Sequence, residues 1–116
     1  MKPLLIIDAA NVVGSVPDGW WRDRRAAAER LRDRLTKIDG DADILMVVEG
    51  KAKGIQAIPG VPVFNAPGSG DDAIVELVRA NGDREVIVVT ADRGLRERVT
   101  ELGAQVRGPS SIRPTP

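Results

Sequence analysis

The chain has 116 residues, of which 42% are apolar, so it fits one folded domain and is too apolar for a disordered protein. It contains no cysteine and no histidine, which excludes disulfides, thiolate metal sites, histidine-based catalytic triads and histidine general bases. Its 17 basic and 17 acidic residues cancel, so no strong overall attraction to nucleic acid is expected. Any catalysis must therefore use carboxylates, hydroxyls, Lys, Arg or a metal held by oxygen ligands.

The first half of the chain predicts two buried strands separated by a loop and a helix. Residues 2–8 form an apolar run that ends in Asp8, which is typical of a buried parallel strand. Residues 9–19 contain three Gly or Pro breakers and predict a loop. Asp18 is expected to cap a helix that runs to about residue 38. Residues 43–49 then predict a second buried strand, which ends in Glu49.

The second half predicts three further strands and two helices. Residues 61–64 predict a short strand, and Pro62 indicates a sheet edge. A helix is expected over residues 71–81, a β-branched strand over 85–90 and a helix from Asp92 to about Gly103. Residues 104–107 predict a fifth strand. Strands that alternate with helices indicate an α/β fold, with a parallel sheet and helices on both faces. We expect one domain over residues 1–108 and a disordered, Pro-rich tail over 109–116.

Acidic residues stand at the predicted strand ends and at the helix starts that follow them. Asp8, Glu49 and Asp92 end or follow strands, and Asp71 and Asp72 open a helix. Because ligands of a parallel sheet bind outside the carboxyl ends of its strands, these acids can meet at one site. Gathered carboxylates repel one another, and a hard cation such as Mg²⁺ relieves the repulsion. The sequence therefore favours a small metal-dependent nuclease.

Four of these acids also have a structural interpretation. Asp8 can be a turn residue, Asp92 an N-cap, and Asp71 and Asp72 can simply favour a helix N-terminus. At 100° per residue, Asp71 shares a helical face with apolar residues whereas Asp72 points away. Asp71 is therefore the one of the pair expected to face the site.

Basic residues and two tryptophans are concentrated after the first strand. Residues 22–37 contain seven positive and three negative side chains, a face that could hold phosphates. Trp20 and Arg24 fall on the apolar stripe of the predicted helix, so core packing of Trp20 is favoured over stacking on bases. We expect Arg24 either to pair with an acid or to face substrate. Lys51, in the loop after the second strand, could reach phosphate.

Three short motifs resemble the PIN-like nuclease superfamily, in particular its NYN branch and the bacterial YacP-like RNA-binding proteins. They are Ile6-Ile7-Asp8-Ala9-Ala10-Asn11-Val12-Val13, Gly70-Asp71-Asp72-Ala73-Ile74 and Val89-Thr90-Ala91-Asp92-Arg93. The resemblance covers the chain to about Gly108. It implies a five-stranded parallel sheet in the order 3-2-1-4-5, and Mg²⁺- or Mn²⁺-dependent cleavage of RNA phosphodiester bonds.

Carried over by position, the resemblance assigns roles to single residues. Asp8, Asp71 and Asp92 would be catalytic metal ligands, with Asp72 and Glu49 as further candidate ligands and Glu49 the loosest match. From their own positions in the chain, the candidates for contact with substrate are Asn11, Arg24, Lys51, Thr90 and Arg93. Asn11 could instead hydrogen-bond Asp8 or form a turn, and Thr90 could instead support Asp92. The substrate expected is single-stranded RNA.

Two other functions compete with the ribonuclease. A PIN-like fold can bind RNA or a protein without cutting, and an incomplete acidic set would favour that function. A receiver-like Mg²⁺ module would need a second acid beside Asp8, an Asp after the third strand and a late Lys, none of which is present. No apolar run is long enough for a membrane helix and no secretory signal is seen, so we expect a cytoplasmic protein. The sequence leaves open a homodimer or a protein partner.

Overall fold

The computed structural model describes residues 1–38 and 40–112. Its elements are, in chain order, β1 (Leu4–Asp8), α1 (Ala9–Gly14), η1 (Trp20–Arg22), α2 (Arg24–Leu35), β2 (Asp43–Val48), η2 (Gly50–Ala52), β3 (Val63–Asn65), α3 (Gly70–Ala80), β4 (Val86–Val89), α4 (Arg93–Glu101), β5 (Gln105–Arg107) and η3 (Pro109–Ile112). The five strands form one parallel sheet in the order β3-β2-β1-β4-β5. The predicted α/β fold and strand order are confirmed.

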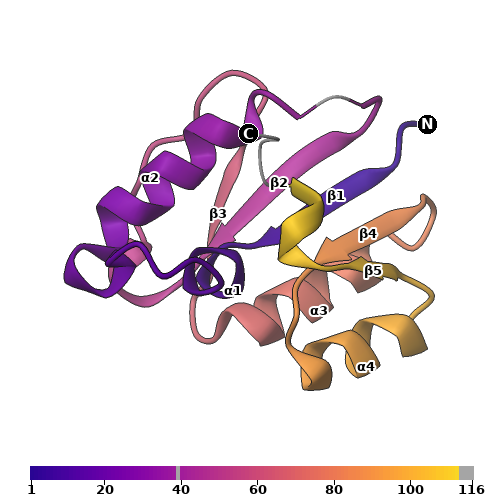
Figure 1. Ribbon diagram of the computed structural model, residues 1–116. Helices are drawn as coiled ribbons and strands as arrows, with labels where there is room; N and C mark the ends of the chain where they lie inside the picture. The colour runs from indigo at the N-terminus through magenta and orange to yellow at the C-terminus, as the bar shows by residue number, and fades with distance from the viewer. Residues whose placement is uncertain (39, 113–116) are drawn as a thin grey trace.

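The sheet lies between two helical layers, each with its own apolar core. Leu5 and Ile7 of β1 pack with α1, α2 and Ile112 of η3, whereas Leu4 and Ile6 pack with α3 and α4. Figure 1 shows α1, α2 and η3 over one face of the sheet, and α3 and α4 over the other. Both faces of β1 are covered, which explains why its five residues form an unbroken buried run.

The chain after β1 differs from the prediction. The expected loop over residues 9–19 contains α1, because Asp8 caps it by accepting from the Asn11 backbone N–H at 3.5 Å. The expected helix start at Asp18 is also wrong. Gly19 has a φ of 82°, which interrupts any helix there, and α2 begins only after Asp23 accepts from the Ala26 N–H at 3.0 Å.

The end of the described chain is ordered where a disordered tail was expected. The short 3₁₀ helix η3 spans Pro109–Ile112, and its first and last residues, Pro109 and Ile112, are buried. Ile112 joins the core on the α2 side of the sheet, so its burial offsets the entropy cost of ordering this segment. The prediction is therefore wrong for residues 109–112, and residues 113–116 lie outside the described part of the chain.

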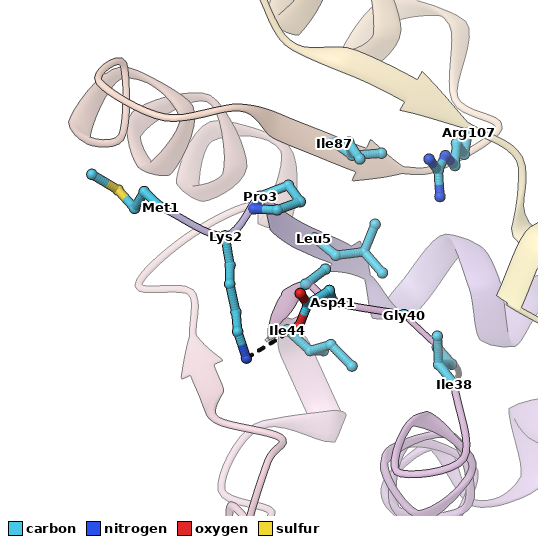
Figure 2. Close-up of a pocket in the computed structure, with 11 residues that line it drawn as sticks. Met1, Lys2, Pro3, Leu5, Ile38, Gly40, Asp41, Ile44, Ile87 and Arg107 are labelled. Atoms are coloured by element: carbon cyan, nitrogen blue, oxygen red, sulfur yellow. Dashed lines mark ion pairs between the residues drawn. The ribbon is translucent and has the colours of Figure 1, made fainter.

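A cavity of about 610 Å³ lies at the amino ends of β1 and β2, which is the opposite end of β1 from Asp8. Figure 2 shows Pro3, Leu5 and Ile44 on its walls, and an ion pair of 3.6 Å between Lys2 Nζ and Asp41 Oδ1. None of the predicted site residues lines this cavity. Separately, no helix in the described residues is long and apolar enough to cross a membrane.

Candidate active site

Asp8 is the most buried of the predicted site acids, with 4% of its surface exposed. Its Oδ2 accepts a hydrogen bond of 2.8 Å from the Thr90 hydroxyl, and its Oδ1 accepts from the Asn11 N–H. Burial raises the pKa of Asp8 to about 6, and the negative charges of Asp71 and Glu49 add to this, whereas the two hydrogen bonds oppose it. Asp8 is thus a buried side chain held in one orientation, and burial and its acidic neighbours destabilise its charged form.

Thr90 and Asn11 connect the ends of β1 and β4. The Thr90 hydroxyl donates to Asp8 and accepts from the Asp92 N–H at 3.1 Å, and the Thr90 side chain is fully buried. Asn11 Oδ1 accepts from the Ala91 N–H at 2.8 Å. Of the two roles that the sequence left open for Thr90, its contacts favour support of the acids over contact with a phosphate, because its buried hydroxyl bonds both Asp8 and the Asp92 N–H.

Glu49 reaches from the end of β2 to the start of α3. Its Oε2 accepts a hydrogen bond of 2.9 Å from the Gly70 N–H, one of the free donors at the N-terminus of α3. A Cβ at position 70 would lie 2.9 Å from Glu49 Oε1, so a glycine is needed for this contact. Sequence reasoning missed Gly70, although the Gly-Ser-Gly start of the helix is a usable signal.

Asp71 and Asp72 separate as the helical geometry predicts. Asp71 is half-buried, and burial raises its pKa together with the charges of Asp92 and Glu49, whereas Arg98 lowers it. Asp72 is exposed and forms an ion pair of 3.0 Å with Arg98 of α4. Asp71 therefore faces the other acids, while Asp72 joins α3 to α4. The role of Arg98 as partner of Asp72 had no signal in the sequence.

Asp92 caps α4 by accepting from the Leu95 N–H at 2.9 Å. Its negative charge also raises the pKa of Asp71. Capping uses Oδ1, which leaves Oδ2 free for another ligand. The two interpretations made from the sequence, N-cap and site acid, are therefore compatible at this residue.

The acids that interact in this way form what we call the acidic cluster: Asp8, Glu49, Asp71 and Asp92. The cluster forms because β2, β1 and β4 are neighbours and parallel, so their carboxyl ends meet at one edge of the sheet. Its oxygen ligands suit a hard cation such as Mg²⁺ or Mn²⁺, which would relieve the repulsion between the carboxylates. Within residues 1–38 and 40–112, however, no three acidic side chains lie close enough together to hold one ion without moving.

Three basic residues predicted to contact substrate are exposed. Arg24 begins α2, Lys51 lies in η2 and Arg93 begins α4. The Arg24 guanidinium carbon lies over Trp20, 5.3 Å from the centre of the ring. Arg24 was expected on the apolar stripe of a longer helix, but it is exposed at the first residue of α2, and Trp20 belongs to η1.

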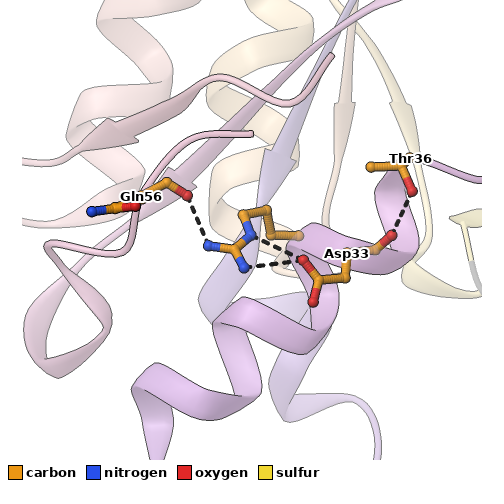
Figure 3. Close-up of polar contacts among 4 residues, drawn as sticks. Asp33, Thr36 and Gln56 are labelled. Carbon is orange, nitrogen blue, oxygen red and sulfur yellow. Dashed lines mark hydrogen bonds and ion pairs between the residues drawn. The ribbon is translucent and has the colours of Figure 1, made fainter. Parts of the chain in front are cut away.

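Other basic residues of α2 are occupied within the protein. Arg32 donates to the Gln56 carbonyl at 2.8 Å and pairs with Asp33 at 3.0 Å (Figure 3). Arg30 lies 3.9 Å from Asp18. Arg32 thus ties α2 to the loop that follows η2, and the basic face of α2 is only partly available to phosphates.

The fold and the site define a three-layer α/β domain with carboxylates gathered at the carboxyl edge of a parallel sheet. The chain is similar in fold to Rae1 (YacP) from Bacillus subtilis, with a TM-score of 0.76 and 20% sequence identity over 94% of this chain and 70% of that one. A mutant of the same protein matches with a TM-score of 0.70 and 17% identity, over 97% and 72% of the two chains. No family model and no curated protein sequence matches.

These comparisons agree with the YacP-like resemblance at the level of fold. Membership of the PIN-like superfamily and the roles of the acids remain predictions.

Proposed function

We propose that the chain is a metal-dependent ribonuclease that cleaves phosphodiester bonds of single-stranded RNA at the acidic cluster. The observation that carries the proposal is the environment of Asp8, a buried carboxylate fixed by Thr90 and Asn11 and raised in pKa by burial and by Asp71 and Glu49. A carboxylate in such surroundings is expensive to keep charged, which favours a cation as its partner. RNA as the substrate rests on the resemblance of the three motifs.

The residues of the acidic cluster and their neighbours would have different roles in this reaction. Asp8, Asp71 and Asp92 would hold a Mg²⁺ or Mn²⁺ ion, with Glu49 as a further candidate ligand. When bound, such an ion would lower the pKa of a water ligand and stabilise negative charge on the phosphate. Thr90 and Asn11 keep Asp8 in one orientation, and the Gly70 N–H keeps Glu49 beside the start of α3. The chain has no histidine, so a carboxylate or solvent would have to accept the proton of an attacking water.

Exposed cations at the same edge of the domain would bind the RNA backbone. Arg24, Lys51 and Arg93 have no ion-pair partner among the residues that the structure describes. The chain as a whole is neutral, and the acidic cluster repels the phosphates of RNA. Local cations are therefore needed to attract this polyanionic substrate.

The test is incubation of an end-labelled, unstructured RNA with the purified protein in Mg²⁺, Mn²⁺ or Ca²⁺. Cleavage with Mg²⁺ or Mn²⁺ that disappears in Asp8→Asn supports the proposal. Asn retains the size of Asp and an acceptor for Thr90, but it lacks the charge that attracts the ion. Equal cleavage by wild type and Asp8→Asn would place the activity elsewhere or in a contaminant.

A second candidate function is RNA binding without cleavage, or binding of a protein partner. The observation that favours it is that no three acids of the described chain are placed to hold one ion without rearrangement. Binding of the same RNA in Ca²⁺, together with no cleavage in Mg²⁺ or Mn²⁺, would establish the non-catalytic function.

A further inference from the structure

A cavity of about 360 Å³ lies directly beside the acidic cluster. It is bounded by α1, the start of α2, the end of β2 and η2, and small apolar side chains such as Ala9, Val13 and Ala28 line it. Its volume is within the roughly 300–1,000 Å³ of small-molecule sites. Glu49 belongs both to the wall of this cavity and to the acidic cluster. A group attached to a phosphate at the acids can therefore enter it.

One side of the cavity carries an aromatic ring with a guanidinium group over it. Trp20 and Arg24 both line it, with the Arg24 guanidinium carbon 5.3 Å from the ring centre. Trp20 is half-buried and packs against the core, and Trp21 meets its ring edge-on at 5.9 Å, so the ring is held in place. Arg24 is exposed and makes no ion pair or hydrogen bond with the described residues. These features suit a flat aromatic ligand that carries a negative phosphate.

We propose that this cavity is a subsite for one unpaired nucleobase of the RNA, next to the phosphate held at the acidic cluster. The inference rests on the proposed ribonuclease function. A base can stack on the indole or on the guanidinium plane, as single-stranded bases do on aromatic and arginine side chains. A base within a duplex has both faces stacked and its edge paired, so it cannot enter. Because stacking accepts every base, the subsite selects unpaired nucleotides and not a particular sequence.

The first test uses tryptophan fluorescence, because Trp20 and Trp21 are the only tryptophans in the chain. Trp21→Phe leaves Trp20 as the reporter, and Trp20→Phe leaves Trp21. Each variant is titrated in Ca²⁺ with an unstructured RNA octamer and with an abasic oligomer that has the same number of phosphates. RNA is expected to quench Trp20 and not Trp21, while the abasic oligomer quenches neither.

The second test measures affinity for the same two ligands in Ca²⁺. Trp20→Ala should weaken RNA binding by about ten-fold or more, which is the range expected for loss of base stacking, and should leave abasic binding unchanged. Trp21→Ala is the matched control, because Trp21 is exposed and does not line the cavity. Arg24→Lys retains the positive charge but removes the planar guanidinium group on which a base can stack. It should therefore weaken RNA binding more than Arg34→Lys does. Circular dichroism and melting temperatures identify any variant that fails to fold. If Trp20→Ala does not fold, Arg24→Lys and the two Trp→Phe variants still test the subsite.

The outcomes separate this subsite from the proposed function. Equal affinity for RNA and the abasic oligomer, or equal losses in Trp20→Ala and Trp21→Ala, would overturn the subsite. If the wild type cuts RNA while Trp20→Ala and Arg24→Lys bind and cut it normally, only the subsite is refuted. If the wild type binds RNA through Trp20 in Ca²⁺ but never cuts it, the subsite stands and the catalytic function is refuted.

Discussion

Asp8 combines burial, two hydrogen bonds and acidic neighbours in one side chain. Its pKa of about 6 in the folded protein lies above the ordinary value of 3.8 for the unfolded chain. The folded state therefore binds this proton more tightly than the unfolded state does. The contribution of Asp8 to metal-free stability is largest below about pH 4, falls as the pH rises through about 4 to 6, and stays low above that window.

This dependence predicts how Asp8→Asn changes stability without metal. The variant has no carboxylate to deprotonate, so its stability relative to wild type should rise between about pH 4 and pH 7, by on the order of 3 kcal/mol. Denaturant unfolding of both proteins in EDTA at several pH values measures the difference. Part of the change belongs to Asp71 and Glu49, whose charges act on Asp8. A difference that does not vary with pH would contradict the buried, raised-pKa state of Asp8.

Asp71 and Asp72 provide a matched pair of adjacent carboxylates. Asp71 faces the acidic cluster, whereas Asp72 forms an exposed ion pair with Arg98, a kind of contact that contributes about 0 to 1 kcal/mol. Asp71→Asn should therefore remove most Mn²⁺-dependent RNA cleavage, and Asp72→Asn should retain it within a few-fold. Initial cleavage rates of the two variants test which of the two acids belongs to the site. A larger loss in Asp72→Asn would show that the wrong acid has been assigned to the site.

At the scale of elements, the start of α3 is where the fold and the site depend on each other. Gly70 opens the helix, its N–H holds Glu49, and Ser69 caps the helix by accepting from the Asp72 N–H at 3.1 Å. A β-carbon at position 70 would meet the end of the flexible Glu49 side chain, not backbone. The clash can therefore be relieved by displacement of the Glu49 carboxylate alone.

Gly70→Ala is thus predicted to affect the site more than the fold. Alanine favours a helix by up to about 1 kcal/mol over glycine, which offsets the lost Glu49 contact, so the melting temperature in EDTA should change little. The displaced Glu49 should weaken binding of Mn²⁺, measured by calorimetry. Gly68→Ala is the control, because a β-carbon there meets no atom within 4 Å. Unchanged Mn²⁺ affinity in Gly70→Ala would exclude Glu49 from the metal site.

The elements show which features the sequence could predict. Strands β1, β2 and β4 were predictable because buried parallel strands are apolar runs, and the acids at or after their ends mark the carboxyl edge of the sheet. Helix α1 was missed because six residues are too few for a helical period to be recognised, and because its cap is Asp8, a residue already assigned to a strand end. The Glu49–Gly70 contact spans 21 residues of sequence and follows only from the packing of α3 beside β2.

The whole molecule brings together acids from four separate elements of the chain. The parallel order β2-β1-β4 makes this possible, since it places three carboxyl ends side by side, and the first residue of α3 is hydrogen-bonded to Glu49 at the same edge. Burial is the main cause of the raised pKa values of Asp8 and Asp71, and repulsion between the gathered acids raises both pKa values further.

A cation that binds only the folded state should therefore stabilise the molecule. At a hundred times its dissociation constant, such an ion would contribute about 2.7 kcal/mol, which for a domain of this size raises the melting temperature by several degrees. We expect this shift for wild type in excess Mn²⁺ at pH 7.5, and a much smaller one for Asp8→Asn. The shift should also shrink at pH 5, where Asp8 is mostly protonated. No shift in wild type at millimolar Mn²⁺ would count against a metal site.

The proposed function requires the acidic cluster to cut RNA with the help of a divalent ion. Its most direct test is the rate at which an end-labelled unstructured RNA is cleaved in Mn²⁺ by wild type, by Asp8→Asn and by Asp83→Asn. Asp83 is an exposed acid in the turn before β4, so it controls for the loss of one negative charge. We predict that Asp8→Asn lowers the rate by roughly 100-fold or more, as expected when several kcal/mol of charge stabilisation is lost, and that Asp83→Asn cleaves as wild type does. Equal rates for all three proteins, or no cleavage by any of them, would refute metal-dependent cleavage of RNA at the acidic cluster.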